Sequence, residues 1–473
     1  MRPRLSNRPA SSRHDLITGT LLCAAVAGVV LRAFTGWDWP EALAELATLA
    51  VVVWLTPTVR ASRQIFVLLA LALVLYAVIA APHAGDVLSR ALSQGSFILA
   101  FFCALATLRH AAELSASITR AAVYLAQQPP GRRYTALTLG AQVFSLVLNY
   151  GAISLLGTMA RSSAHGEPDP DIARIRTRRM LLAVQRGFGA SLCWSPLALA
   201  VVISTTVVPG ATWGSVVLPA LVSSALMTGV GWGLDRAFKP KLRPGQVPTR
   251  ADPAEIGGAA TLLPVGALLL CIALPVILLH FGTGLPASRI VLLVVPLVAA
   301  LWLFRMGPAK ARTRYLGAHA GAFLFRELPA FRSEIVLLTM AGFLGMGAGT
   351  LLAPLVAATG LDLAALPVWL LLVLPIWLIL LGGQIGMNPI LFVSLFGPLL
   401  PAPEELGITA TPMVLSLTAG WALAGVTSPF TASVMMTARL GDTDAKEVSL
   451  RWNGPYVLIL GVVLSAWVLL LAW

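Results

Sequence analysis

The sequence predicts an all-α polytopic membrane protein, and three features of its composition indicate this class. Of the 473 residues, 58% are hydrophobic and only 11% are charged, whereas a soluble domain carries about 25% charged residues. Mean hydropathy is +0.84 over the whole chain. A transmembrane helix needs roughly 20 apolar residues, so a chain of this length and hydropathy has room for ten or more spans. A soluble globular protein and a disordered chain are both excluded.

Apolar runs separated by charged residues or by Pro and Gly predict about 11 transmembrane helices. These runs lie near residues 15–33, 41–58, 64–81, 94–126, 181–208, 213–234, 262–281, 287–304, 333–358, 410–438 and 454–472. Two further apolar stretches contain internal breaks and are interpreted as re-entrant hairpins. They lie at residues 134–160 and 367–400. The four cysteines lie inside apolar runs without metal-ligand spacing, so neither disulfides nor a metal site is expected.

The basic residues predict the orientation in the membrane. The formal net charge is +13, with 33 Lys and Arg against 20 Asp and Glu, and the excess is concentrated in alternate loops. Such an excess marks cytoplasmic loops, so we do not expect nucleic acid as a partner. The prediction is a multi-pass protein of the bacterial inner membrane, in contact with the lipid bilayer. Its N-terminus is cytoplasmic, and Trp473 ends outside.

The hairpin interpretation follows from the charges that flank each stretch. Basic residues stand on both sides of 134–160, so both of its ends are cytoplasmic and two half-helices meet at Asn149-Tyr150-Gly151. Acidic residues flank 367–400, which is broken at LGGQIGMNP (381–389) and enters from outside. Irregular backbone at membrane depth is tolerated only where protein or a water-filled cavity covers it. Both tips are therefore expected to line a site.

An internal repeat follows the hairpins. The segment GFGASLCWSP begins at Gly187, and GWALAGVTSP begins at Gly420. The two glycines stand 233 positions apart, as do Ser195-Pro196 and Ser428-Pro429. Proline has no N–H for the helix ladder, so both segments predict broken helices. Because one hairpin opens inward and the other outward, the halves are expected to be inverted repeats, which are typical of secondary transporters.

The expected organisation divides the chain into four parts. Residues 1–93 form N-terminal spans of a scaffold, and residues 94–234 form the first repeat, with hairpin 134–160 and broken helix 181–208. A linker with two spans and an interfacial helix covers residues 235–332. Residues 333–473 form the second repeat, with hairpin 367–400 and broken helix 410–438.

This combination resembles the ion transporter superfamily, in particular the divalent anion:sodium symporters. The resemblance covers the architecture from about residue 94 onward. It implies a homodimeric elevator carrier, with sodium between each tip and the following broken helix and substrate between the tips. The Ser-Asn-Thr tip triplets of the dicarboxylate branch are absent, since Leu148-Asn149-Tyr150 and Met387-Asn388-Pro389 stand there. The chemical class of the substrate and the coupling ion thus stay open.

The candidate site residues come from the tips and the breaks. Those of the first half are Asn149, Tyr150, Gly151, Ser191, Trp194, Ser195 and Pro196; those of the second half are Gln384, Gly386, Asn388, Pro389, Thr427, Ser428, Pro429 and Thr431. No Asp or Glu occurs in either hairpin or broken helix. This favours sodium held by neutral oxygens, with Asn149, Ser195, Asn388 and Ser428 as candidate ligands. No other cofactor is expected.

Arg186 is the one charged residue in the span 181–208. It is either an anion contact or a side chain that snorkels to the cytoplasmic surface, and the second interpretation is favoured.

The function predicted is sodium-coupled secondary transport of a small organic anion. Two alternatives with the same fold are a proton-coupled exporter and the membrane subunit of a binding-protein-dependent (TRAP-type) carrier. An enzyme is not expected, because GxSxG, HExxH and paired intramembrane aspartates are absent from the sequence.

Overall fold

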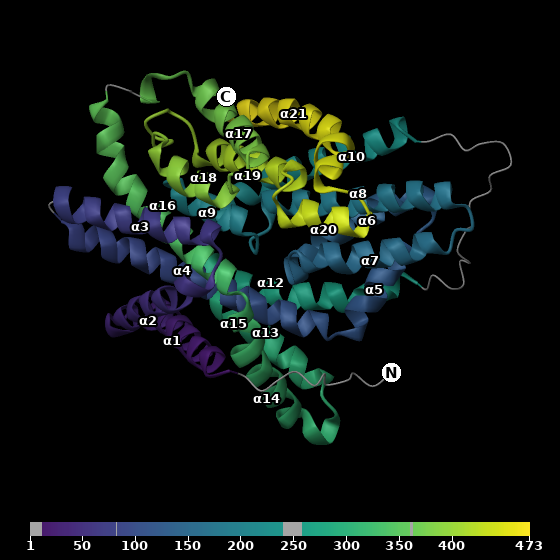
Figure 1. Ribbon diagram of the computed structural model, residues 1–473, viewed down its shortest axis with the longest axis horizontal. Helices are drawn as coiled ribbons and strands as arrows, with labels where there is room; N and C mark the ends of the chain where they lie inside the picture. The colour runs from purple at the N-terminus through teal and green to yellow at the C-terminus, as the bar shows by residue number, and fades with distance from the viewer. Residues whose placement is uncertain (1–11, 82, 240–257, 360–362) are drawn as a thin grey trace. The chain divides into compact units, whose positions relative to one another are not determined.

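The computed structural model describes residues 12–81, 83–239, 258–359 and 363–473, and these ranges contain helices and no strands (Figure 1). Within them, 11 helical segments are long and apolar enough to cross a membrane. The predicted class, an all-α polytopic membrane protein, is confirmed. The N-terminal tail and most of the basic segment after α10 (Trp213–Ala237), both used to predict orientation, lie outside the described residues.

The described residues group into two compact units. Unit 1 comprises Met1–Ala111 and Arg289–Gly347, and unit 2 comprises Ala112–Ser288 and Ala348–Trp473. All candidate site residues belong to unit 2. The expected division into scaffold and inverted repeats concerns function and membrane orientation, and it stays a prediction.

Unit 1 is built from long helices that approach closely at small residues. Gly28 lies against the backbone of Ala44, and Gly342 lies against that of Gly95. The helices are α1 (Arg13–Thr35), α2 (Trp39–Leu55), α3 (Ala61–Ala80), α4 (Ala84–Glu113), α13 (Ala287–Met306), α14 (Arg312–Ala322), α15 (Leu328–Ala330) and α16 (Arg332–Ala358), of which the part from Ala348 onward belongs to unit 2. Short 3-10 turns occur at Thr56–Thr58 and Ala309–Ala311. A π-helical turn, Phe323–Glu327, joins α14 to α15 and packs on α1. The segment predicted as an interfacial helix is therefore helical.

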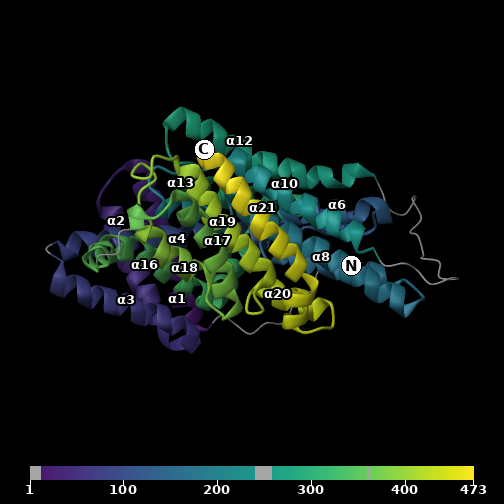
Figure 2. The same cartoon turned by 90° about the horizontal axis from the view of Figure 1, so that it is seen from above.

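Unit 2 surrounds a buried central helix. The helices are α5 (Ala116–Ala126), α6 (Pro130–Leu148), α7 (Gly151–His165), α8 (Pro170–Trp194), α9 (Leu199–Val207), α10 (Trp213–Ala237), α12 (Leu263–Thr283), α17 (Val368–Gln384), α18 (Pro389–Phe396), α19 (Ala410–Thr427), α20 (Ala432–Leu440) and α21 (Gly454–Ala472). Short 3-10 turns lie at Ala259–Leu262, Leu363–Ala365 and Gly397–Leu399, and a π-helical turn lies at Glu447–Trp452. Helix α19 is buried from Pro412 to Thr427 and packs against α8, α17 and α21. Figure 2 shows α21 (yellow) running beside α19 and α10.

Two predicted helix boundaries were wrong. The span 94–126 is divided, because α4 ends at Glu113 and α5 begins at Ala116, after an extended Ser115. The helix predicted to start at residue 181 begins 11 residues earlier in the structure, at Pro170. There Asp169 Oδ1 accepts hydrogen bonds from Asp171 N at 2.8 Å and Ile172 N at 3.2 Å. An Asp N-cap followed by Pro is a strong helix start, and it extends α8 through the basic residues.

Candidate functional site

The first predicted hairpin consists of two helices joined by a two-residue turn. Helix α6 ends at Leu148, and Asn149 follows with φ +50° and ψ −128°. The N–H of Asn149 donates to the carbonyl of Ser145 at 3.0 Å, and the carbonyl of Asn149 accepts from Ala152 N–H at 3.0 Å. With ψ −128° this residue lies outside the αL region in which Asn is enriched, in a conformation that glycine adopts most readily. The entry of this hairpin into a bilayer stays a prediction.

This hairpin packs on the broken helix that follows it. A Cβ on Gly187 would lie 2.2 Å from the carbonyl oxygen of Thr138, so α6 and α8 touch backbone to backbone. The ring of Tyr150 lies 4.9 Å from that of Phe188 on α8. Tyr150 nevertheless keeps 39% of its surface exposed. The first tip is thus anchored to α8 with one aromatic face open.

The second hairpin turns at a glycine. Helix α17 ends at Gln384, Gly386 has φ +88°, and α18 begins at Pro389. Asn388 Oδ1 accepts from Ile390 N–H at 2.9 Å, so Asn388 is the N-cap of α18. A Cβ on Gly386 would lie 3.5 Å from the ring of Phe430. The second tip therefore contacts the second break.

The two breaks have the same local geometry. Ser195 (φ −66°, ψ 124°) and Ser428 (φ −70°, ψ 122°) are both extended, because a following proline disfavours the α region. Each hydroxyl accepts an N–H two residues on, from Leu197 at 3.2 Å and from Phe430 at 3.3 Å. Helix resumes at Leu199 and at Ala432. The breaks predicted at the two Ser-Pro pairs are therefore present.

Side-chain hydrogen bonds connect the second break to the second hairpin. Ser428 Oγ donates to the carbonyl of Gly383 at 2.6 Å, and Gln384 Nε2 donates to Thr427 Oγ1 at 3.3 Å. Thr431 Oγ1 donates to the carbonyl of Ser428 at 2.8 Å. The structure therefore brings the second-half candidates Gln384, Thr427, Ser428 and Thr431 together.

The carbonyls freed by the second break are already paired. The carbonyl of Gly425 accepts from Ser433 Oγ, that of Val426 from Gln185 Nε2, and that of Thr427 from Ser449 Oγ. None of these three oxygens needs a further partner.

The first break is less fully paired. The indole N–H of Trp213 donates to the carbonyl of Trp194 at 3.0 Å. The carbonyls of Leu192 and Cys193, however, receive no hydrogen bond from any described residue. The reason is local: Pro196 has no N–H, and that of Leu197 is directed to Ser195 Oγ. Two unpaired carbonyls remain at this break.

The other first-half candidates are held locally. Ser191 Oγ donates to the carbonyl of Phe188 at 2.7 Å. Trp194 Nε1 donates to Gln142 Oε1 at 3.0 Å, which ties the end of α8 to α6. Among the described residues, no hydrogen bond or ring contact joins Asn149 to Ser195. Asn149 thus makes no bond to Ser195 that would correspond to the bond between Ser428 and Gly383 in the second half.

A polar chain connects the broken helices to α21. Gln185 Nε2 donates to the carbonyl of Val426 at 3.3 Å, and Asn453 Nδ2 donates to Gln185 Oε1 at 3.0 Å. Arg186 Nε donates to Asn453 Oδ1 at 3.1 Å. Arg186 is only 5% exposed, so the favoured snorkelling interpretation was wrong: its guanidinium is turned into the protein.

Some of the oxygen atoms at the tips and breaks can still bind a small hard cation. In the described part of the chain, no three His, Cys, Asp or Glu side chains come together as a metal site. Asn388 Oδ1 and the Ser195 and Ser428 hydroxyls each already accept one hydrogen bond, although an oxygen of either kind has two lone pairs. The Leu192 and Cys193 carbonyls are the oxygens with most capacity left.

In fold, the chain is similar to the crystal structure of the YdaH transporter from Alcanivorax borkumensis, which is reported to have an unusual topology. The TM-score is 0.50 at 18% sequence identity, and the match covers 79% of this chain and 84% of that one. No protein-family model and no curated protein matches the sequence. At this identity the similarity concerns the fold alone.

Sequence reasoning missed several residues that organise the site. They are Gln142, Gln185, Ser433, Ser449 and Asn453, which supply the hydrogen bonds described above. The signal available was a polar side chain in an apolar segment, because a buried polar group must find a partner. Their partners lie up to 268 positions away, and the sequence does not show these pairings.

Proposed function

We propose that this protein is a secondary active transporter that moves a small organic anion across the bacterial inner membrane by an elevator mechanism coupled to sodium. One observation carries the proposal: unit 2 contains the arrangement of hairpin, close glycine contact and Ser-Pro break twice. Gly187 meets the Thr138 carbonyl of its hairpin, and Gly420 meets the Pro375 carbonyl of the other. The similarity in fold to a transporter structure supports the same conclusion.

The chemistry of the breaks suits an anion with a cation. Helices α9 and α20 begin directly after the breaks, and helix N-termini favour negative charge. The unpaired Leu192 and Cys193 carbonyls, with Ser195 nearby in sequence and Asn149 from the preceding hairpin, are the neutral oxygens that we assign to sodium. In this proposal both hairpins are re-entrant, the two tips hold the anion, and sodium binds at the first break.

The proposal assigns separate tasks to the two units. Unit 2 contains every candidate site residue and would carry the substrate, while unit 1 would supply the scaffold and the contact of a homodimer. The N-terminus would be cytoplasmic and the C-terminus outside. The bilayer and a small anion are the expected partners, nucleic acid is not one of them, and no catalytic reaction is assigned.

Flux in proteoliposomes tests this function. A panel of organic anions is offered to the reconstituted protein with an inward sodium gradient, a proton gradient or neither. We expect sodium-dependent uptake of at least one anion, lost in Ser195→Ala and kept in Thr158→Ala, which removes an exposed hydroxyl of α7. Uptake that ignores sodium and follows the proton gradient would overturn the coupling. Absence of flux for every anion would overturn transport by the chain alone.

A further inference from the structure

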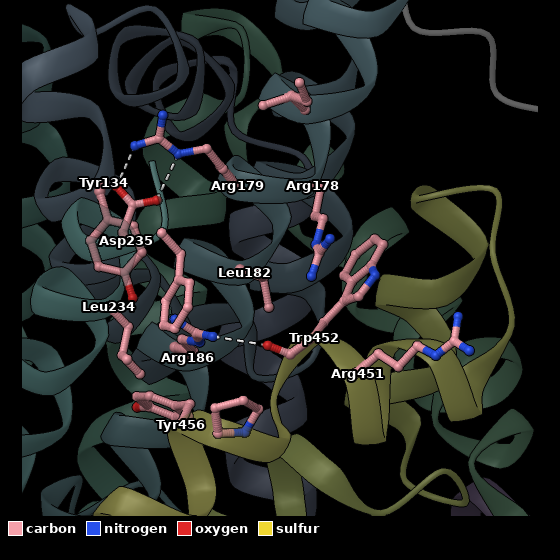
Figure 3. A pocket seen from close by; sticks show the side chains of 13 residues that line it. Tyr134, Arg178, Arg179, Leu182, Arg186, Leu234, Asp235, Arg451, Trp452 and Tyr456 are labelled. Atoms are coloured by element: carbon pink, nitrogen blue, oxygen red, sulfur yellow. Dashed lines mark hydrogen bonds and ion pairs between the residues drawn. The ribbon is translucent and has the colours of Figure 1, made fainter. Parts of the chain in front are cut away.

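A basic cavity lies in unit 2 at a place that the proposed transport function does not use. Its volume is about 410 Å³. Residues of α6, α8, α10, the π-helical turn before α21 and the start of α21 line it, as Figure 3 shows. Four arginines, Arg178, Arg179, Arg186 and Arg451, face a single carboxylate, Asp235, in the lining.

Two of these arginines already have carboxylate partners. Arg179 makes a bidentate pair with Asp235, with Nε and Nη2 at 2.7 and 2.6 Å from its oxygens. Arg451 pairs with Glu447 at 3.2 Å, and its side chain is 79% exposed. Neither is therefore free to neutralise a ligand.

Arg186 is buried without a counter-ion. Its partners are the side-chain oxygen of Asn453 and the carbonyl of Trp452, both at 3.1 Å, and the ring of Tyr456, 4.3 Å from its guanidinium carbon. All three are neutral. Buried charges in proteins are normally paired, and Arg186 lacks a carboxylate partner among the described residues. An anion in the cavity would complete its environment.

Two further groups of the lining are open to a ligand. The guanidinium of Arg178 lies over the Trp452 ring at 5.2 Å. Glu447 interacts with it electrostatically, but no described carboxylate lies within ion-pair distance of it. The hydroxyl of Tyr134 is buried and near Arg186 and Thr138, but no described group meets it with good hydrogen-bond geometry. The guanidinium groups of Arg178 and Arg186 and the hydroxyl of Tyr134 surround one cavity. Together they can donate hydrogen bonds to the oxygens of a phosphate group.

The depth of these arginines favours a lipid as the source. Arg186 stands nine residues before Ser195, about 14 Å along the helix. If that break is near the midplane, as in the transport proposal, Arg186 lies near the edge of a half-bilayer of about 15 Å. Arg178, two turns further out, then lies at headgroup depth.

An apolar strip continues from the cavity along α21. Pro455 lines the cavity, and Leu458 and Val462 follow on the same helical face. These two side chains are 61% and 64% exposed. The acyl chains of a lipid whose headgroup occupies the cavity would contact this strip.

We propose that this cavity binds a phosphate ester anion, supplied by the headgroup of an anionic phospholipid. Basic pockets between helices on the cytoplasmic side suit such headgroups. The inference does not depend on flux, since binding is measured on the purified protein.

Native mass spectrometry of the full chain, with thermal unfolding alongside, tests the site. Phosphatidylglycerol, phosphatidylcholine and glycerol 3-phosphate are each titrated against wild type, Arg178→Gln, Arg186→Gln and Arg174→Gln. Arg174 is the matched control, because its side chain is 80% exposed, pairs with Asp171 and lies outside the cavity. Arg178→Gln is included because Arg186→Gln removes a buried side chain and can disturb folding, whereas Arg178 lies over the Trp452 ring.

We expect phosphatidylglycerol to bind wild type and Arg174→Gln equally, and Arg178→Gln about tenfold more weakly. Phosphatidylcholine should bind far less. Binding of glycerol 3-phosphate with the same arginine dependence would support the phosphate chemistry and place its source in free esters. Equal binding of both lipids, or an unchanged Kd in both cavity variants, would overturn the proposal.

Discussion

Asn149 and Gly386 are the residues at which the two hairpins reverse direction, and both have positive φ, +50° and +88°. Asn388, which the sequence paired with Asn149, instead caps α18 through its side chain. The two asparagines therefore serve different local purposes. Substitutions at the two positions are expected to have different effects on stability.

Asn149→Gly separates the backbone of the first tip from its side chain. Glycine takes positive φ at no steric cost, so we expect the Tm to stay the same or rise. Asn149→Ala should lower stability, by about 1 kcal/mol, because alanine is strained at this φ. If the amide binds substrate or sodium, both variants lose uptake and the thermal stabilisation by ligand. Wild-type uptake in Asn149→Gly would remove the side chain from the site.

Asn388→Ala removes an N-cap. The expected loss is about 0.5–2 kcal/mol of stability, measured by thermal unfolding in detergent. Asn388→Ser restores a capping oxygen and should recover most of the loss. If Asn388→Ser is as unstable as Asn388→Ala, the cap is not what Asn388 contributes.

The close contacts of Gly187 and Gly420 should not tolerate a methyl group. A Cβ would lie 2.2 Å from the Thr138 oxygen in the first case and 2.9 Å from the Pro375 oxygen in the second. We expect Gly187→Ala and Gly420→Ala to destabilise by about 1–3 kcal/mol, the first more than the second. Gly214→Ala is the control, since its Cβ would meet nothing within 4 Å. Similar unfolding temperatures for all three variants would contradict the packing of hairpins on broken helices.

His319 is expected to make unit 1 sensitive to acid. Burial, and then His110 with its ring centroid 5.8 Å away, lower the pKa of His319 below 6.5, while Glu327 opposes this. His110 Nδ1 lies 2.7 Å from Glu327 Oε2. The folded state thus binds fewer protons here than the unfolded state, so stability falls as pH drops below about 6.5.

The measurement is Tm at pH 8 and pH 5.5. His319→Gln should lose less Tm between these values than wild type, while His165→Gln on α7 should behave as wild type. An unchanged pH dependence in His319→Gln would show that another group carries it.

The sequence predicted the features of the site that arise locally. Both breaks lie at Ser-Pro pairs, where the proline frees a carbonyl and the serine before it is extended. The positive φ at Gly386 and the burial of Arg186 were beyond prediction. Gly386 lies against Phe430, and Arg186 donates to Asn453. Both partners are remote in the sequence, and tertiary packing decides such contacts. The eleven spans were predictable because hydropathy acts over each segment alone.

The last prediction uses one difference between the two breaks. The carbonyl of Leu192 is unpaired, whereas that of Gly425, at the corresponding position, accepts from Ser433 Oγ. Pro196→Ala returns an N–H four residues after Leu192 and removes the restriction that keeps Ser195 extended. The α-helix can then close over the Leu192 oxygen.

If that oxygen ligates sodium, Pro196→Ala should abolish sodium-dependent uptake and the rise in Tm that sodium gives wild type. Pro429→Ala is the matched control, because the Gly425 carbonyl is already occupied by hydroxyls and is not offered to an ion. It should keep the sodium-induced rise in Tm. Equal loss of that rise in both variants would mean that closing either break disturbs the fold rather than the sodium site, and an unchanged rise in Pro196→Ala would place sodium away from the first break.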